Sequence, residues 1–184
     1  MVRRRILRLC VTCAVLALTV FAGASAVAST SAPTVPPLTR PPAGQVLLIG
    51  AVAHPEILSV ANLQALPAHT ETVTFQTGNG PQTHTFTGPL LLDVLSQAGP
   101  QFDSTIKNDK LRYYISVSAT DNYRALVAYG EIDPGFENKE ILLATSQDGQ
   151  SLATAGPRLV VPGDMSGGRY VTNVNRVFFE KPPL

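Results

Sequence analysis

The hydrophobic and polar positions after residue 44 predict many short strands and few helices. An apolar run over residues 45–52 suits a first strand. Residues 70–75 and 82–86 alternate polar and apolar side chains, and the Gly-Asn-Gly-Pro sequence at 78–81 between them predicts a hairpin. Further strands are expected at residues 111–118, 123–128, 141–145, 158–161 and 174–179.

Helix signals are sparse. Ser59 is placed to cap a short helix that Pro67 ends. Residues 89–99 begin with proline and end with glycine, as a helix does, and a helical turn is expected near 130–134. The leucines of the 89–99 helix that should face the core are Leu91, Leu92 and Leu95. Because strands follow strands, the pattern predicts an α+β fold, β-rich with short helices, around a mixed or antiparallel sheet.

The N-terminal residues 1–28 have the layout of an export signal. A basic start is followed by an apolar stretch of 14 residues, 9–22, and by small residues that predict cleavage after Ala26 or Ala28. A membrane span needs about 20 apolar residues. We therefore expect cleavage, no stable membrane span afterwards, and a periplasmic or extracellular protein; an uncleaved anchor is the alternative.

The basic start also bears on the export route. Residues 3–8, Arg-Arg-Arg-Ile-Leu-Arg, resemble the twin-arginine box of proteins that are exported already folded, although Val2 stands where Ser or Thr is usual. Both this route and the general secretory route stay open. Residues 29–44 are rich in Pro, Ser and Thr and predict a semi-rigid tether, which leaves residues 45–184 as the folded domain.

Removal of the leader changes the charge and the chemistry of the chain. Four of the 14 basic residues lie in the leader and all 13 acidic residues lie after it, so ten against 13 gives the mature chain a net charge of −3. This balance argues against nucleic acid as a partner. Both cysteines, Cys10 and Cys13, also lie in the leader, so the mature chain offers no thiolate to a metal or a substrate.

The segment from Arg158 to Val171 runs an apolar strand into a glycine-rich loop. Gly163, Gly167 and Gly168 free the backbone to direct several N–H groups to one spot. Arg158 and Arg169 could hold the two sides of a phosphate, sulfate or carboxylate. A β-hairpin with a glycine-rich turn is the alternative interpretation.

Other candidate chemistry is weak. The three histidines, at 54, 69 and 84, form no metal-binding pattern, and His84 could face a cleft or simply lie on the surface of the hairpin. Asp133 and Glu137 flank a Pro-Gly turn, which explains them better than a pair of catalytic carboxylates. Ser166 lacks the surroundings of a hydrolase nucleophile.

Taken in order, several segments resemble the sulfite-oxidase-like molybdopterin-binding domain, a family of oxidoreductases. The segments are residues 59–67, 73–76, 86–90, 93–95, 121–124, 158–163 and 168–171. The resemblance implies a mixed α+β domain whose cleft grips the phosphate and ring of molybdopterin, with molybdenum as the metal and a redox protein as partner. The cofactor-binding positions that it implies are Asn79, Arg158, Gly163, Ser166, Gly167, Gly168 and Arg169.

The chain departs from this family at the metal. Thr77 occupies the place of the family's cysteine ligand, and an alcohol is a far weaker acid than a thiol. Residues 172–173, Thr-Asn, also differ from the family's usual Lys and Trp. Two hypotheses follow: an exported oxidoreductase with an atypical or lost metal site, or a non-enzymatic exported domain that binds a small anion or a protein partner in the same cleft.

Overall fold

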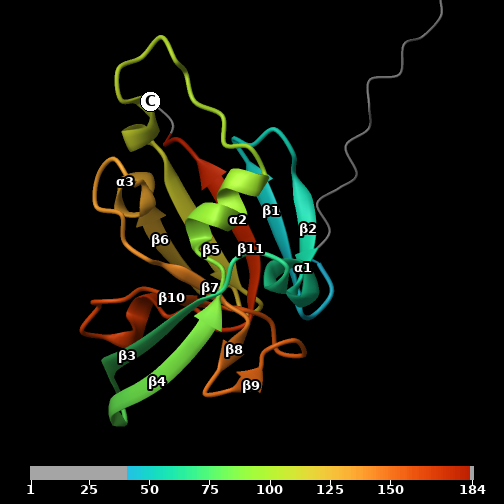
Figure 1. Cartoon of the computed structure of the whole chain (residues 1–184), viewed down its shortest axis with the longest axis vertical. Helices are drawn as coiled ribbons and strands as arrows, with labels where there is room; N and C mark the ends of the chain where they lie inside the picture. The colour runs from blue at the N-terminus through green and yellow to red at the C-terminus, as the bar shows by residue number, and fades with distance from the viewer. Residues whose placement is uncertain (1–40, 183–184) are drawn as a thin grey trace, which may run out of the picture. The chain divides into compact units, whose positions relative to one another are not determined.

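The computed structural model describes residues 41–182, and these lie within one compact unit (Figure 1). The predicted leader and most of the predicted tether lie outside the described residues. In the described part, no helix has the length and apolar character needed to cross a membrane.

The larger sheet is mixed, as the sequence predicts. Its five strands lie in the order β2-β1-β11-β5-β6. They are β1 (Gln45–Gly50), β2 (Glu56–Ser59), β5 (Tyr114–Ala119), β6 (Arg124–Ala128) and β11 (Val174–Glu180). β1 and β11 run parallel, and the other neighbours run antiparallel. The first and last strands of the domain therefore lie side by side.

The remaining strands form two smaller sheets. One has the order β3-β4-β8-β9, and the other pairs β10 with β7. Their strands are β3 (His69–Thr77), β4 (Gly80–Gly88), β7 (Leu142–Ala144), β8 (Ser146–Gln147), β9 (Gln150–Ser151) and β10 (Arg158–Val160). The Thr145 N–H donates to the Thr87 carbonyl (2.8 Å), which ties β4 to the end of β7. In Figure 1 the green β3–β4 hairpin extends from this junction.

The β3–β4 hairpin confirms the predicted alternation and is longer than predicted. On its exposed face, three cross-strand pairs of threonine hydroxyls lie within hydrogen-bond distance, at 2.9, 2.9 and 2.8 Å. The pairs are Thr70 with Thr87, Thr72 with Thr85, and Thr74 with Thr83. The opposite face buries Val73, Phe75 and Phe86. Because side chains alternate along a strand, one register fixes both faces.

The helices are short. They are α1 (Val60–Gln64), α2 (Leu91–Gln97), α3 (Tyr129–Ile132) and the 3₁₀ turns η1 (Asp109–Arg112) and η2 (Gly167–Arg169). Ser59 caps α1 as predicted and forms a capping box with Asn62. The strand expected from residue 111 begins only at Tyr114, because left-handed Asn108 (φ 56°) starts η1 instead.

Two apolar cores hold these layers together. The main core lies against the five-stranded sheet and includes the buried Leu91 and Leu95 of α2; Leu92 is only partly buried. A second, smaller core lies between the hairpin and the β7–β10 pair. Its buried members are Val73, Phe75, Phe86, Leu142, Ala144, Val160 and Tyr170.

Gly88 lies where the hairpin meets β7, and we expect its replacement to separate the two. A Cβ at this position would lie 2.6 Å from both the Ala144 Cα and the Leu143 carbonyl oxygen. Gly88→Ala should therefore lower the free energy of unfolding by about 1–3 kcal/mol, as overpacking does. The measurement is urea denaturation. Gly78→Ala is the control, since a Cβ there meets no atom within 4 Å; equal stability losses in both variants would contradict the prediction.

Candidate functional site

A pocket of about 470 Å³ lies between the tip of the β3–β4 hairpin and the glycine-rich loop. Its lining comes from both segments and from the start of β10. The lining residues are Phe75, Gln76, Thr77, Gly78, Gln82, Arg158, Ser166, Gly167 and Gly168. Among these described residues, Arg158 alone carries a charge. The pocket is therefore a partly apolar, amide-rich site with one cation.

The glycine-rich loop is fixed against the hairpin by backbone contacts. The Gln76 N–H donates to the Met165 carbonyl (2.8 Å), and Gln76 forms an isolated parallel bridge with Ser166. Gly167 lies so close to the Phe75 ring that an added Cβ would sit 2.9 Å from it. The Tyr123 hydroxyl donates to the Gly168 carbonyl (2.6 Å). The loop thus extends the edge of β3.

The base of the loop is also closed. The Leu159 N–H donates to the Val171 carbonyl (2.9 Å), and the Val174 N–H donates to the Pro157 carbonyl (2.9 Å), as in a hairpin. The strands on either side, β10 and β11, nevertheless belong to different sheets. The base of the loop is therefore closed, as the hairpin interpretation predicts, and one side of the loop lines the pocket.

Arg158 lies on the pocket wall with an incomplete set of partners. Its Nη1 donates to the Gln147 Oε1 (2.9 Å), and its guanidinium carbon lies 5.2 Å from the centre of the Phe86 ring and 5.9 Å from that of Phe75. Its Nε is buried without a hydrogen-bond partner in the described structure, where Arg158 has no ion pair either. Burial lowers the pKa of this arginine. A cation desolvated in this way is stabilised by an anion.

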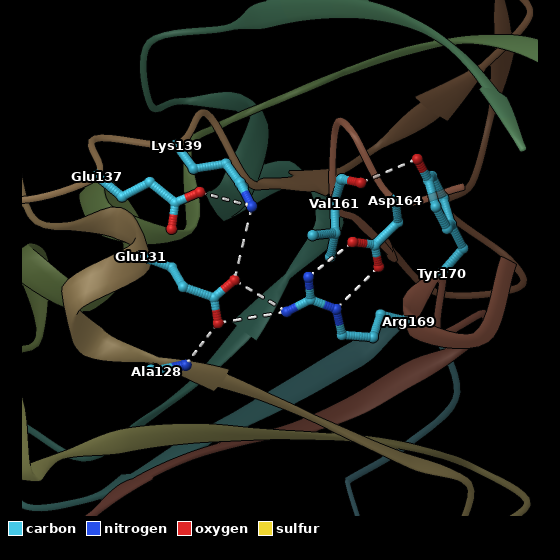
Figure 2. A network of polar contacts seen from close by, with 8 residues as sticks. All are labelled: Ala128, Glu131, Glu137, Lys139, Val161, Asp164, Arg169 and Tyr170. Carbon is cyan, nitrogen blue, oxygen red and sulfur yellow. Dashed lines mark hydrogen bonds and ion pairs between the residues drawn. The ribbon is translucent and has the colours of Figure 1, made fainter. Parts of the chain in front are cut away.

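Arg169, at the other end of the loop, is fully engaged (Figure 2). Its Nε and Nη2 donate to the two carboxylate oxygens of Asp164 (2.8 and 2.7 Å), and its Nη1 donates to Glu131 (2.9 Å). Glu131 also accepts the Ala128 N–H (2.9 Å) and lies 3.8 Å from Lys139. The Asp164 carboxylate, above all, raises the pKa of Arg169. Arg169 therefore ties the loop to α3 and does not line the pocket.

Tyr170 connects the loop to the small core. Its ring stacks on Phe75 with centroids 4.1 Å apart. Its hydroxyl donates to the Val161 carbonyl (3.0 Å), a contact drawn in Figure 2. Burial raises the pKa of Tyr170, so the phenol stays neutral and keeps this donor. The Tyr170 ring is therefore held by its stacking on Phe75 and by the hydrogen bond of its hydroxyl.

Thr77 lines the pocket, but its hydroxyl closes the hairpin turn. Its Oγ1 donates to the Gly80 carbonyl (2.8 Å) and accepts the Asn79 N–H (3.1 Å). Within the described residues, no three side chains among His, Cys, Asp and Glu cluster as metal ligands would. The residues present thus fit the anionic, organic part of a cofactor and offer no thiolate to its metal.

The structure brings together five of the eight predicted site residues: Thr77, Arg158, Ser166, Gly167 and Gly168 line the pocket. Asn79 and Arg169 are not part of the lining, and Gly163, with φ 87°, turns the chain after β10. Sequence reasoning did not single out Gln82 as a site residue. Its alternation with Phe86 along β4, on the same face of the strand, is the signal that could have found it.

His84 is not part of the pocket lining. Its Nδ1 is 2.7 Å from the Asp148 Oδ2, and its ring centroid is 5.9 Å from that of Phe86. The Thr85 N–H, which donates to the Asp148 Oδ1 (2.9 Å), is the main cause of the lowered pKa of that carboxyl, and His84 contributes.

The β-rich α+β fold thus carries a pocket whose described lining holds one cation, Arg158, and no acidic side chain. The sequence matches the family described as the oxidoreductase molybdopterin binding domain over residues 34–183. The chain therefore belongs to this sulfite-oxidase-like family and is an oxidoreductase-like domain of the molybdopterin-binding type. This membership supports molybdopterin with molybdenum as its cofactor class.

A solved structure of the same fold supports the architecture. The sulfane dehydrogenase SoxCD from Paracoccus pantotrophus superimposes with a TM-score of 0.60 at 18% sequence identity. The match covers 75% of this chain and 38% of the SoxCD chain, so this protein spans well under half of that neighbour. A comparison with curated proteins gives no match.

The Arg169 clamp should stabilise the domain. Arg169→Met leaves the Asp164 and Glu131 carboxylates facing each other without their shared cation. We expect a loss of about 1–3 kcal/mol in the free energy of unfolding, as for hydrogen bonds to charged groups. Thermal and urea denaturation measure it. Arg124→Met, at an exposed position in β6, is the matched control, and a similar small change in both variants would contradict the clamp.

Proposed function

We propose that this protein is an exported member of the sulfite-oxidase-like family whose pocket holds an anionic ligand of the molybdopterin class, with an atypical or lost metal site. The observation that carries this proposal is the Arg158 guanidinium, which lines the pocket while its Nε is buried without a partner. The family match supports the ligand class.

The electrostatics of the pocket favour an anion. Burial of a cation costs free energy unless a counter-charge or hydrogen bonds compensate it. In the described structure, the direct contacts of the Arg158 guanidinium are one neutral amide and two aromatic faces. A phosphate group supplies both the charge and the acceptor oxygens that a guanidinium matches in geometry.

The rest of the lining suits a flat polar ligand. Phe75 contributes an aromatic ring, and Gln76, Gln82 and Ser166 contribute amides and a hydroxyl that both donate and accept hydrogen bonds. A pterin carries ring nitrogens, an amino group and a carbonyl, which need both kinds of partner. Arg158 would hold the phosphate end, and the amide side chains would meet the ring.

The metal is where this chain departs from its family. When bound, molybdopterin supplies two sulfur ligands and a redox-active molybdenum, to which family enzymes add a protein cysteine. The Thr77 hydroxyl, at that position, is committed to the hairpin turn through Gly80 and Asn79. This chain would therefore contribute binding and orientation and no soft anionic ligand.

The second candidate function is a non-enzymatic exported domain that uses the same pocket for a small anion or a segment of a protein partner. The missing thiolate favours it. It differs from the first in one measurable respect, because such a domain carries neither pterin nor molybdenum. If the first candidate holds, a redox partner protein is also expected.

Cofactor analysis of protein purified from its own exporting host separates the two. We expect released pterin, measured by fluorescence after oxidation, to approach one per chain, with elemental analysis giving the molybdenum content. Arg158→Gln should lower the pterin content severalfold without a matching loss of stability. Less than a few per cent of both pterin and molybdenum per wild-type chain would overturn the cofactor proposal and leave the non-enzymatic function.

Export is part of the proposal, and its support is the sequence of residues 1–28. We expect the mature protein to begin after Ala26 or Ala28, which N-terminal sequencing of the secreted or periplasmic fraction tests. Replacing Arg3 and Arg4 by lysines should block export if the twin-arginine route is used. Unchanged export of this variant would assign the general route, and a protein that retains residue 1 would contradict cleavage.

A further inference from the structure

The two arginines of the loop region have opposite electrostatic surroundings. Arg169 is paired with two carboxylates, whereas Arg158 has a neutral amide as its hydrogen-bond partner. We propose that Gln147 is a positioning residue that orients the Arg158 guanidinium and, because it is neutral, leaves the positive charge of Arg158 free for the anionic ligand. This inference rests on the proposed anion-binding function and assigns the residue that controls it.

The orientation of the Gln147 amide is fixed by chemistry. A guanidinium has donors only, so the atom 2.9 Å from the Arg158 Nη1 must be the amide oxygen, Oε1. The amide nitrogen lies 3.1 Å from the His84 Nδ1, but that ring nitrogen carries the proton directed to Asp148, so it does not accept a hydrogen bond from the amide. Gln147 belongs to β8, and its backbone position pairs with Phe86 of β4, one of the two rings beside the guanidinium. The amide is therefore anchored to the same hairpin that forms the pocket wall.

The acidic residue next to Gln147 forms no ion pair with Arg158 among the described residues, although its charge partly opposes the lowering of the Arg158 pKa by burial. Asp148 follows Gln147, and its two oxygens are occupied by the Thr85 N–H (2.9 Å) and the His84 Nδ1 (2.7 Å). An ionised carboxylate only accepts hydrogen bonds, so this His84 nitrogen carries the proton in that contact. The Thr85 N–H and the His84 ring thus engage both carboxylate oxygens of Asp148, and the ion pairs of the described residues include none to Arg158.

A carboxylate at position 147 would reverse this arrangement. Glutamate has nearly the shape of glutamine, so Gln147→Glu keeps the contact with the Arg158 Nη1 and adds a negative charge. The result would resemble the pairing of Arg169. Arg158 would then gain an internal partner and lose its free charge, which predicts higher stability together with weaker anion binding. If Gln147 had a purely structural role, the variants that bind the anion more weakly would also be the less stable ones.

The test is a titration of the full mature chain with inorganic phosphate. Binding is monitored through the NMR chemical shifts of the Arg158 Nε–H and of the Gly167 and Gly168 amides. We expect Gln147→Glu to weaken phosphate binding by more than about tenfold, in line with the loss of a charge-assisted hydrogen bond. Its thermal midpoint should equal or exceed that of the wild type. Gln147→Leu, which removes the acceptor and adds no charge, should lower the midpoint and weaken binding less.

Gln150→Glu is the matched charge control. Gln150 is exposed in β9 and is the cross-strand partner of Gln147. The Gln150→Glu variant therefore adds the same charge close to Gln147 and not at the position that contacts Arg158. Its phosphate affinity should stay within about twofold of wild type, as expected for a screened surface charge. If the wild type binds phosphate and the affinity of Gln147→Glu lies within twofold of it, the proposed role of Gln147 is wrong and the proposed function stands. Equal losses of phosphate affinity in both Glu variants would have the same meaning. If the wild type shows no phosphate-dependent shift and carries no pterin, the proposed function fails and takes this inference with it.

Discussion

The glycine-rich loop can lie against the hairpin only because Gly167 presents no side chain to the ring of Phe75. That contact places the loop along the edge of β3, where the Gln76 N–H reaches the Met165 carbonyl, and it leaves Phe75 free to stack on Tyr170. The pocket is the space that remains between the loop and the hairpin tip. Any side chain at position 167 would push the loop away from the hairpin, so the site depends on a missing Cβ as much as on the groups that line it.

The two arginines that bracket this loop divide its work. Arg169 forms ion pairs with Asp164 and Glu131 and so fixes the loop to α3. Arg158 contacts two aromatic rings and an amide, and it lines the pocket. A spacing argument treats them as equivalent clamps, but their partners make one a structural residue and the other the candidate ligand-binding residue. Thr77 shows a similar division, since it lines the pocket while its hydroxyl serves the hairpin turn.

Local patterns in the sequence were enough to predict much of the fold. The alternation along β3 and β4, the Ser59 cap and the Pro-to-Gly frame of α2 are each decided by neighbouring residues, and each is confirmed. The two-residue strands β8 and β9 could not be predicted, because they are too short to show a period and are defined by pairing, β8 with β4 and β9 with β8. Distance along the chain also hid the partners of the arginines: Glu131 lies 38 residues before Arg169, and nothing local links them. The pattern of glycines and arginines made this loop a candidate site, but it could not tell which of the loop's residues line the pocket.

The threonine pairs on the exposed face of the hairpin constrain its register in addition to the burial of Phe75 and Phe86. A slip of one residue between β3 and β4 would break all three hydroxyl pairs and, in the same movement, turn the buried ring of Phe75 or Phe86 toward water. Both faces therefore penalise the same error. This double penalty fixes the alignment of the two strands, and with it the part of the pocket wall that Phe75, Gln76 and Gln82 form.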